Sequence, residues 1–336
     1  MANRANPYYS GPVSDHFNGR EFFNPDGVEP RGFADLMRWQ FGGGRAKWPG
    51  SWPSPFPQVK PEAAIDGGRL AVTMVGHASL LIQMAGLNIL TDPLWAERAS
   101  PFSFVGPKRV NAPGIAFEDL PKIDVVVLSH NHYDHMDGGT IRRLTEKHDP
   151  LLITPLGNDV IVRKSAPNMR IEARDWGESV QIGSVSIHIE PAHHWSARGT
   201  GDRRMALWSA FVIEAGPDKV YFAGDTGFHG GRNFRAAREK HGRFRFAMIP
   251  IGAYEPRWFM EAQHQNPDEA VEAFKLLGAQ NAAGMHWGTF QLTNEPIEEP
   301  RDLLHAALDR EGIARERFRA MQPGEMWEVD RLEGAG

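Results

Sequence analysis

The 336-residue sequence contains no cysteine. This absence excludes a disulfide framework, a thiolate nucleophile, a zinc finger and an iron–sulfur cluster, so any bound metal must use nitrogen and oxygen ligands. An excess of positive charge is also missing, because the formal net charge is -5. A chain with this charge is not generally attracted to nucleic acid, and we therefore do not expect a nuclease or another nucleic-acid-binding protein.

Long hydrophobic runs are the third absence. The first residues, "MANRANPYYSGP", lack the apolar segment of a secretory signal, and no stretch of about 18 apolar residues occurs anywhere in the chain. We therefore expect a cytoplasmic protein that makes at most peripheral contact with a membrane. The sequence leaves the oligomeric state open, with a homodimer as one option.

Residues 1–60 are rich in proline, glycine and aromatic residues. This composition is typical of an extended arm, interrupted here by one short helix predicted over Phe33 to Gln40. We expect the arm to pack on a single main domain of residues 61–336, because aromatic side chains rarely stay exposed. The alternative is an apolar lip beside a substrate site. The aromatic residues in question are Trp39, Trp48, Trp52 and Phe56.

Strands and helices alternate from Leu70 onward, which indicates an α/β (α+β) fold. Two segments share one pattern, "LAVTMVGHASLLIQMAGLNILTDP" and "SAFVIEAGPDKVYFAGDTG". Each has an apolar strand, a turn with Ala-Gly, a second apolar strand and then an aspartate, Asp92 or Asp225. This internal similarity predicts two related halves that face each other.

The stretch "VVVLSHNHYDHMD" places four metal-ligand side chains after an apolar run typical of a strand buried on both faces. Imidazole and carboxylate suit Zn²⁺, and also Mn²⁺ or Fe. A catalytic zinc needs about three protein ligands, so this cluster exceeds one site and does not complete two. The clustered residues are His130, His132, Asp134 and His135. Further candidates follow other predicted strands: Asp92, His193 or His194, Asp225 and His286. His148 and His188 lack this context and are expected to be structural.

The motif His-x-His-x-Asp-His resembles the signature of the metallo-β-lactamase superfamily. The resemblance implies an αββα sandwich of two mixed sheets flanked by helices, with two Zn²⁺ ions, or Mn²⁺ or Fe, at one edge. It implies catalytic roles for Asp134 and for Asp92, which would orient a ligand or the nucleophilic water. Of the two adjacent histidines we choose His194, because the family segment reads histidine followed by tryptophan. The implied ligands are His130, His132 and His194 for one metal, and Asp134, His135 and His286 for the other, with Asp225 bridging.

The residue at position 132 and the missing cysteine restrict which branches of the superfamily the chain can resemble. The oxygen-reducing diiron branch has glutamate where this chain has His132, and some antibiotic-hydrolysing members use a cysteine ligand. The first comparison favours a hydrolase over an oxygen-reducing enzyme, and the second argues against the antibiotic-hydrolysing enzymes that use a cysteine ligand. The segments "DHFNGREFFNP", "LTDPLWAERASP", "PAHHWSARG" and "IGAYEPRWFMEAQHQNPDEAV" are similar to N-acyl-phosphatidylethanolamine phospholipase D enzymes.

That narrower resemblance implies cleavage of a phosphodiester in a lipid by a metal-bridging hydroxide. It implies a substrate or acid role for His264, with Gln263, Tyr254 and Arg257 as substrate-binding neighbours. Isolated cations in loops can also bind phosphate, which adds Arg198 and Lys108 as weaker candidates. We interpret His77 as a buried, hydrogen-bonded histidine that could also support a metal ligand.

Two alternatives remain open at this point. The first is a lactonase or ester hydrolase of the sugar-lactone phosphate type, because the same metals can direct attack on a carbonyl carbon. The second is a non-catalytic metal-binding protein, which the full set of ligands disfavours. The substrate, the native metal and the role of the aromatic arm are not determined by the sequence.

Overall fold

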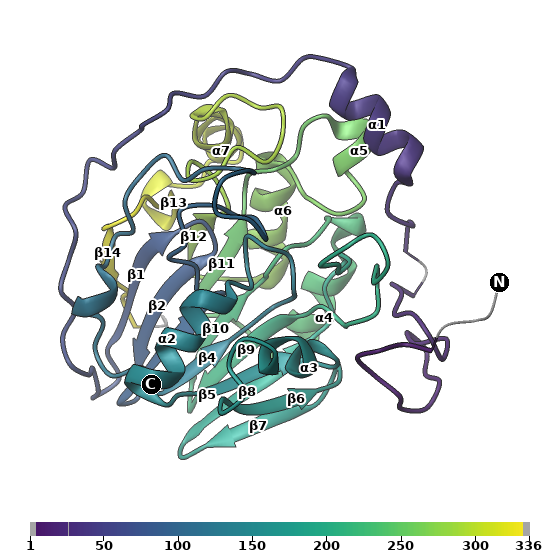
Figure 1. Cartoon of the computed structure of the whole chain (residues 1–336). Helices are drawn as coiled ribbons and strands as arrows, with labels where there is room; N and C mark the ends of the chain where they lie inside the picture. Colours follow the sequence, from purple (N-terminus) through teal and green to yellow (C-terminus); the bar gives the residue numbers. More distant parts are fainter. Residues whose placement is uncertain (1–4, 26, 332–336) are drawn as a thin grey trace.

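The computed structural model describes residues 5–25 and 27–331 and places two seven-stranded mixed sheets face to face (Figure 1). The strands of sheet 1, in spatial order, are β14 (Met326–Glu328), β1 (Leu70–Gly76), β2 (Ser79–Met84), β3 (Leu87–Thr91), β4 (Val125–Val127), β5 (Leu151–Pro155) and β6 (Arg170–Arg174). Those of sheet 2 are β13 (Phe318–Ala320), β12 (Asn281–Met285), β11 (Phe246–Pro250), β10 (Asp218–Phe222), β9 (Ala210–Ala215), β8 (Val185–Glu190) and β7 (Ser179–Ile182).

Helices cover both outer faces of this sandwich, which confirms the predicted fold class. On sheet 1 lie α2 (Gly138–His148) and α3 (Asn158–Arg163); on sheet 2 lie α4 (Arg232–His241), α6 (Pro267–Leu277) and α7 (Glu299–Arg310). Two further helices, α1 (Phe33–Phe41) and α5 (Arg257–Met260), pack on each other. None of the helices described by the structure is long and apolar enough to cross a bilayer. The cytoplasmic location stays a prediction.

The two sheets repeat one strand order, as the internal similarity of the sequence predicts. From β1 to β6 the first two pairings are antiparallel and the next three are parallel. The same succession of pairings runs from β8 to β13. The two segments singled out by the sequence form the equivalent hairpins β2–β3 and β9–β10, one in each half.

Strand β4 shows why its sequence is a continuous apolar run. Its side chains alternate between the two faces of sheet 1. Val125 and Val127 belong to the core between the sheets, whereas Val126 lies in the separate core under α2 with Ile141 and Leu144. Each face is closed by another layer, so no position on this strand tolerates a polar side chain. Residues 128–137, which carry the clustered histidines and are called the histidine loop below, therefore follow a strand that is held on both faces.

The N-terminal arm runs as an extended chain around the outside of the sandwich after α1 (Figure 1). Helix α1 begins at Phe33, as predicted, and ends one residue later than expected. The indole of Trp39 stacks on Phe259 of α5 with 5.0 Å between ring centroids. Of the four aromatic residues considered from the sequence, Trp39, Trp48 and Trp52 contact the main domain. Phe56 is 39% exposed and is the only one of the four that is largely accessible to solvent.

Candidate metal centre

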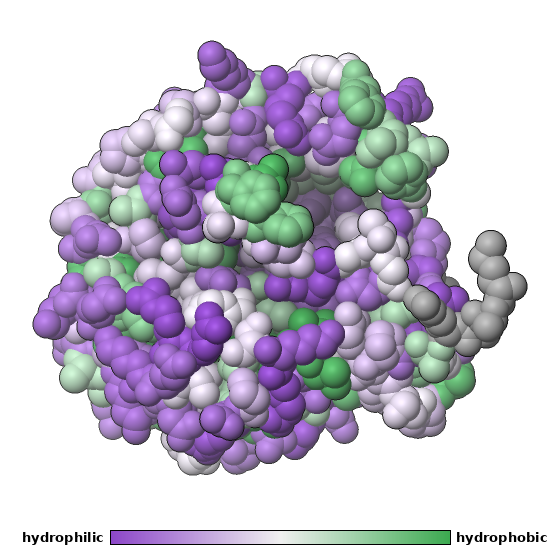
Figure 2. All heavy atoms as spheres, in the orientation of Figure 1, coloured by the Kyte–Doolittle hydropathy of each residue, from purple (hydrophilic) through white to green (hydrophobic). Residues whose placement is uncertain are grey.

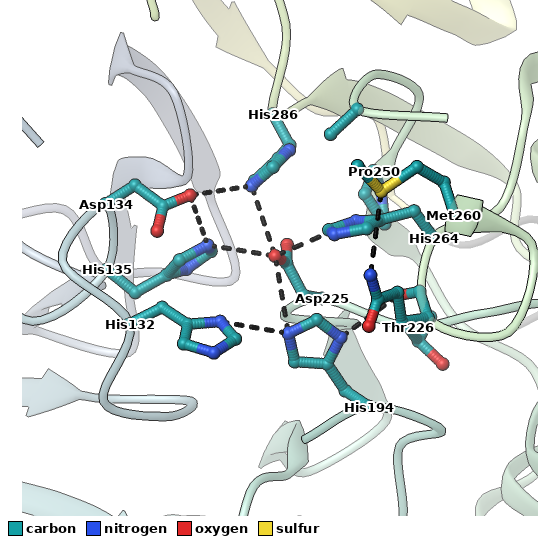
Figure 3. Close-up of polar contacts among 12 residues, drawn as sticks. His132, Asp134, His135, His194, Asp225, Thr226, Pro250, Met260, His264 and His286 are labelled. Atoms are coloured by element: carbon teal, nitrogen blue, oxygen red, sulfur yellow. Dashed lines mark hydrogen bonds and ion pairs between the residues drawn. The ribbon is translucent and has the colours of Figure 1, made fainter. Parts of the chain in front are cut away.

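Loops that follow five strands meet at one edge of the sandwich. The carboxyl ends of neighbouring parallel strands lie at the same edge of a sheet, which is where α/β proteins build sites. Here β3 and β4 end beside each other in sheet 1, as do β10, β11 and β12 in sheet 2. Figure 3 shows the side chains from these ends pointing toward one another around Asp225. The residues brought together are Asp92, His130, His132, Asp134, His135, His194, Asp225 and His286.

Three imidazoles form the first set of ligands. His132 Nδ1 lies 2.9 Å from His130 Nε2 and 3.2 Å from His194 Nε2. Metal–nitrogen bonds of about 2.0–2.1 Å in a tetrahedral site place ligand nitrogens roughly 3.3 Å apart, close to these separations. Burial lowers the pKa of His132 and of His194 to about 3, so both rings are neutral at neutral pH. Converging lone pairs repel unless a cation lies between them, and this set therefore fits a metal ion.

The second set combines one carboxylate with two imidazoles. Asp134 Oδ2 lies 3.2 Å from His286 Nε2 and 3.5 Å from His135 Nε2. Burial opposes protonation of His286, but the carboxylates of Asp225 and Asp134 raise its pKa to about 9. A divalent cation in this position would satisfy the same carboxylates and replace the proton. The donor types and separations again fit a metal ion.

Asp225 lies between the two sets. Its Oδ2 atom is 3.2 Å from the Nε2 atoms of both His135 and His286, and 3.8 Å from His194 Nε2. Burial would raise the pKa of this carboxyl, but His135 and His286 hold it well below its usual range. Oδ1 is buried and has no hydrogen-bond partner among the described residues. One oxygen of this ionised carboxylate therefore faces both sets of ligands.

Two residues, Asp92 and His77, hydrogen-bond to metal-ligand candidates on the side away from the cavity and so orient them. Asp92 is completely buried, and its Oδ2 accepts hydrogen bonds from His135 Nδ1 and Ser129 Oγ, both at 2.6 Å. Of the two roles predicted for Asp92, the structure therefore supports orientation of a ligand, because the carboxylate is occupied away from the cavity. His77 Nε2 lies 3.0 Å from Asp134 Oδ2 and donates to it in the tautomer protonated at Nε2. His77 is thus both buried and in contact with a ligand.

Backbone strain is concentrated at this edge. Three residues of the site have left-handed φ angles: His77 at 59°, Asp92 at 32° and His286 at 63°. Such conformations cost about 1–3 kcal/mol each and persist where the surroundings impose them. His286 N donates to His77 O at 2.9 Å, which joins two of the strained residues. On the other side of His286, Gly252 lets the segment after β11 lie against this residue, because a Cβ at Gly252 would lie 2.3 Å from His286 O.

The structure separates the two adjacent histidines that follow β8. His194 enters the metal centre, whereas His193 turns away and its Nδ1 lies 2.6 Å from Ala262 O. Asn24 of the N-terminal arm donates from Nδ2 to His194 O at 2.8 Å, and its Oδ1 accepts from Trp208 Nε1 at 3.0 Å. Sequence reasoning missed Asn24. The only available signal was its place in "DHFNGREFFNP", a segment quoted for the narrower resemblance.

A cavity of about 420 Å³ opens onto the metal centre. Its floor includes His132, Asp134, Asp225 and His264, and Arg31 and Arg203 are its two basic lining residues. In Figure 2 it lies at the hollow between two apolar patches on the visible face. The apolar wall comes from the arm, from α5 and from loops of the main domain. Its residues are Phe33, Leu36, Trp39, Trp195, Phe259, Met260 and Leu292.

The predicted substrate residues divide into two groups. Gln263 and His264 line the cavity, and His264 Nδ1 lies 3.9 Å from Asp225 Oδ2. Burial lowers the pKa of His264 to about 4, so its ring is neutral at neutral pH and offers one donor and one acceptor. Tyr254 and Arg257 are not among the lining residues.

The structure gives Tyr254 and Arg257 other partners. The Tyr254 hydroxyl donates to Glu299 at 2.7 Å. Arg257 forms a bidentate pair with Glu269, at 2.9 and 3.1 Å, and donates to His264 O at 2.9 Å. Arg257 therefore holds the loop that carries His264, and the cavity lining gives no support to the substrate contacts predicted for Tyr254 and Arg257.

The two weaker phosphate candidates are also committed elsewhere. Arg198 Nη1 donates to the carbonyls of Asn131 and Met136, at 3.1 and 2.8 Å, and so holds both sides of the histidine loop. Lys108 pairs with Glu97 at 2.8 Å. The cations that do reach the cavity, Arg31 and Arg203, were missed because no motif marks them.

The two histidines that were expected to be structural lie away from this centre. His148 Nδ1 accepts from Ile123 N at 3.3 Å, which ties the end of α2 to the loop before β4. His188 lies on β8 next to His241, with ring centroids 4.8 Å apart. Neither ring contacts the ligands described above.

Comparisons with known proteins agree with this geometry. Residues 87–287 match the family model described as the β-lactamase superfamily domain. The chain is 42% identical to N-acyl-phosphatidylethanolamine-hydrolyzing phospholipase D 1 of Caenorhabditis elegans, over 77% of this chain and 76% of the relative. Among solved structures, an isothiocyanate hydrolase from Delia radicum gut bacteria aligns with a TM-score of 0.61 at 19% identity, covering 78% of this chain and 100% of the other.

A diiron β-hydroxylase from Streptomyces venezuelae also aligns, with a TM-score of 0.58 at 20% identity, over 80% of this chain and 55% of the other. At these identities the two structures show the fold alone, and they differ in their chemistry. The chain belongs to the β-lactamase superfamily, as one of its metal-dependent hydrolases. Within the superfamily, it is a relative of the N-acyl-phosphatidylethanolamine-hydrolysing phospholipases D. Both resemblances predicted from the sequence are thus confirmed.

Proposed function

We propose that the protein is a dinuclear metal-dependent phosphodiesterase of phospholipase D type that acts on N-acyl-phosphatidylethanolamine-like lipids. The observation that carries this proposal is the composition of the cavity. Metal ligands form its floor, two arginines contribute positive charge and the remaining wall is largely apolar. A phosphodiester lipid has matching parts, namely a reacting group, a negative charge and acyl chains. The name of the Caenorhabditis elegans relative supports the same substrate class.

The metal centre defines the reaction type. When bound, two zinc ions, or Mn²⁺ or Fe in their place, would supply a water nucleophile at neutral pH and stabilise the negative charge that develops on the phosphoryl oxygens. Asp134 and Asp225 supply negative charge to hold the metals, while Asp92 and His77 keep the ligands His135 and Asp134 in position. Histidine at position 132, rather than a carboxylate, completes a nitrogen-only first set.

The other cavity residues orient the lipid. Arg203 stacks over Trp195, with 4.6 Å from its guanidinium carbon to the ring centroid, and donates to Arg31 O at 2.7 Å. These contacts hold the guanidinium at the cavity wall, where it can pair with a phosphate oxygen. The neutral ring of His264 can hydrogen-bond either to the same phosphate or to the leaving alcohol. The acyl chains then pack against Leu36, Phe259 and the other apolar lining residues.

An assay on three substrate classes tests the proposal. Purified protein of measured metal content is offered N-acyl-phosphatidylethanolamine, a water-soluble bis-aryl phosphate and a panel of lactones. We expect turnover of both phosphodiesters, which is lost on chelation and restored by zinc or manganese. Turnover of lactones alone would instead indicate the lactonase alternative. Absence of bound metal, with no activity after metal is added, would support a non-catalytic protein.

A variant of Arg203 separates the substrate classes further. Arg203→Met keeps much of the side-chain volume and removes the charge, so affinity for anionic phosphodiesters should fall, while a neutral lactone is unaffected. We expect a rise in KM of roughly 10–100-fold for the bis-aryl phosphate, because one charge-assisted hydrogen bond contributes roughly 1.5–3 kcal/mol. The matched control is Arg98→Met, which removes an exposed arginine that bonds to Gly106 O outside the cavity lining. An unchanged KM in Arg203→Met would contradict the role given to this residue.

A further inference from the structure

A second group of histidine and carboxylate side chains lies on the outer face of sheet 2. Side chains alternate between the two faces of β8, and Ile187 and Ile189 enter the core between the sheets. His188 and Glu190 therefore point to the opposite face, where both meet His241, the last residue of α4. We refer to His188, Glu190 and His241 as the outer cluster. None of the three belongs to the metal centre described above.

The donor atoms of the outer cluster converge as metal ligands do. His241 Nε2 lies 2.8 Å from Glu190 Oε1, and the rings of His188 and His241 are 4.8 Å apart between centroids. One donor atom from each of the three residues lies within 4.8 Å of the other two. The ligand atoms of a tetrahedral zinc are roughly 3.3 Å apart when its bonds are about 2.0–2.1 Å long. Small rotations of the side chains are therefore enough to bring all three donors to one ion.

The protein leaves one nitrogen of His188 without a hydrogen bond. Its Nε2 atom is buried and has no hydrogen-bond partner among the described residues. Glu214 of β9 shares this face, because it pairs with Ser186 of β8, and its Oε2 lies 3.5 Å from His188 Nε2. Burial lowers the pKa of His188, so the ring is neutral at neutral pH, and in the tautomer protonated at Nδ1 its Nε2 offers a lone pair. A buried polar atom seldom lacks a partner, and a metal ion would satisfy this one.

The charge around the outer cluster suits a cation. Glu190 and Glu214 bring two carboxylates, which balance one divalent ion. Burial opposes ionisation of Glu190, but hydrogen bonds from His241 and Lys240 hold its pKa below the usual value. Helix α4 ends at His241, and the partial negative charge at the carboxyl end of a helix favours a cation there.

Two lysines balance these carboxylates, and each can yield to a metal. Lys240 Nζ lies 2.7 Å from Glu190 Oε1, but its side chain is 45% exposed and can turn into solvent. Lys219 Nζ lies 3.6 Å from Glu214 Oε1 and also donates to His241 O at 2.6 Å, a bond that it keeps when Glu214 moves. A divalent ion can thus replace the ammonium groups without leaving a buried charge unpaired.

We propose that the outer cluster binds one Zn²⁺ in a structural site, separate from the metal centre. Its ligands are His188, Glu190, His241 and Glu214. Zinc accepts mixed nitrogen and oxygen ligands in four-coordinate sites, whereas Ca²⁺ and Mg²⁺ select oxygen. His241 Nε2 gives up its proton to Nδ1 or to solvent, because a metal ligand must be deprotonated. The ion joins α4 to β8, the strand that precedes His194, and its binding does not rest on the proposed function.

The zinc content of the full chain tests this proposal. Purified protein is dialysed against a fixed concentration of free zinc, and the metal in each chain is measured by mass spectrometry. We expect His188→Asn to bind one zinc per chain fewer than the unchanged protein. The matched control His305→Asn removes a histidine of α7 that lies outside the groups of possible metal ligands among the described residues, and it should bind as many ions as the unchanged protein. Equal zinc content in His188→Asn and the unchanged protein would overturn the proposal.

Asp225→Ala separates the outer cluster from the metal centre. This variant should bind one zinc more than Asp225→Ala/His188→Asn, and zinc should raise the Tm of the first variant only, because an ion that binds the folded state stabilises it. An equal rise in both would show that the ion binds elsewhere and that the outer cluster is a hydrogen-bonded network. Circular dichroism checks folding, and Glu214→Gln, at a more exposed position, should also weaken binding of this ion. Zinc in the outer cluster of a protein without phosphodiester turnover would support this site and contradict only the proposed function.

Discussion

The two halves of the sandwich contribute to the metal centre in different ways. The first half supplies His130, His132, Asp134 and His135 from a single loop after β4. The second half supplies its ligands singly, from the ends of β8, β10 and β12: His194, Asp225 and His286. Ligands in one short loop are placed relative to each other by local backbone conformation. Ligands on three separate strands meet only when the sheet has formed, so the second half makes the centre dependent on the complete fold.

The halves also differ in how they orient a ligand. In the first half, the carboxylate of Asp92 accepts the hydrogen bond of His135 Nδ1. In the second half, His194 Nδ1 bonds to a backbone carbonyl, that of Gln263, at 3.0 Å. A carboxylate adds negative charge as well as orientation, whereas a carbonyl adds orientation alone. Substitution of one side chain, Asp92, can therefore remove the partner of a ligand in the first half. In the second half the partner of His194 is a backbone carbonyl, which no side-chain substitution removes.

The largest effect should come from Asp225→Ala, since this second-half residue faces both sets of ligands. We expect loss of both metals and a fall in the rate of phosphodiester hydrolysis on the order of 10³-fold or more, because the metals supply several kcal/mol of charge stabilisation. Asp134→Ala, which affects one set, should retain one metal. Metal content by mass spectrometry, with circular dichroism as a check of folding, measures the difference. Two metals retained by Asp225→Ala would show that it does not bridge.

Asp92→Asn tests the difference in orientation between the halves. Loss of the carboxylate behind His135 should weaken metal binding by about 10–100-fold, the usual cost of removing a partner of a metal-bound histidine. The matched change in the second half is Gln263→Ala, which leaves its backbone carbonyl in place and should not alter metal affinity. Titration with a chelator that competes for zinc compares the two. Similar losses in both variants would contradict the distinction.

Gly252→Ala tests the dependence of the second half on close packing between strand ends. A Cβ at this position would lie 2.3 Å from His286 O, so His286 must shift. We expect the unfolding free energy to fall by about 1–3 kcal/mol, together with weaker binding of the second metal. Gly50→Ala is the control, because a Cβ there meets nothing within 4 Å. Denaturant unfolding of the metal-free protein measures stability without the contribution of the ions.

The smallest effect concerns the junction of the halves, where the arm is attached between β6 and β7. His16 Nε2 lies 2.7 Å from Asp175 Oδ1. Burial opposes the charged ring, yet the hydrogen bonds to Asp175 and Asp15 raise the pKa of His16 above its usual value. Its contribution should therefore be fully present below the unfolded pKa of about 6.5 and lost as the pH rises through the folded pKa. We expect less than about 1 kcal/mol.

The measurement is the unfolding free energy of the unchanged protein minus that of His16→Asn, followed from mildly acidic to alkaline pH. The difference should shrink as the pH rises. A difference that grows with pH, or does not change, would show that His16 is neutral in the folded protein. Asp119→Asn, which removes an exposed charge that pairs with Lys60 at 3.6 Å, is the control for loss of a surface ion pair.

Several features were predictable because their causes are local. The apolar run of β4, the capped helix beginning at Pro267 and the two Ala-Gly hairpins are each encoded within a short segment. The histidine loop was recognisable for the same reason. The roles of Tyr254 and Arg257 were not predictable, because what they do depends on partners distant in the sequence or in another helix, Glu299 and Glu269. Because both residues are close to His264 in the sequence, they were predicted to contact the substrate. In the structure both bond to carboxylates of the protein, and Arg257 supports the loop that carries His264.

The sequence by itself determined the donor types, the superfamily and the duplicated architecture, since spacing, hydrophobic pattern and the absence of cysteine are properties of the chain alone. The tertiary structure alone decided which groups face the cavity. It brought Arg31 and Arg203 to the cavity, turned His193 away from the clustered ligands and set Asn24 behind His194. The physical reason is that ligand geometry and burial arise from packing between segments far apart in the chain, and no local pattern specifies those contacts.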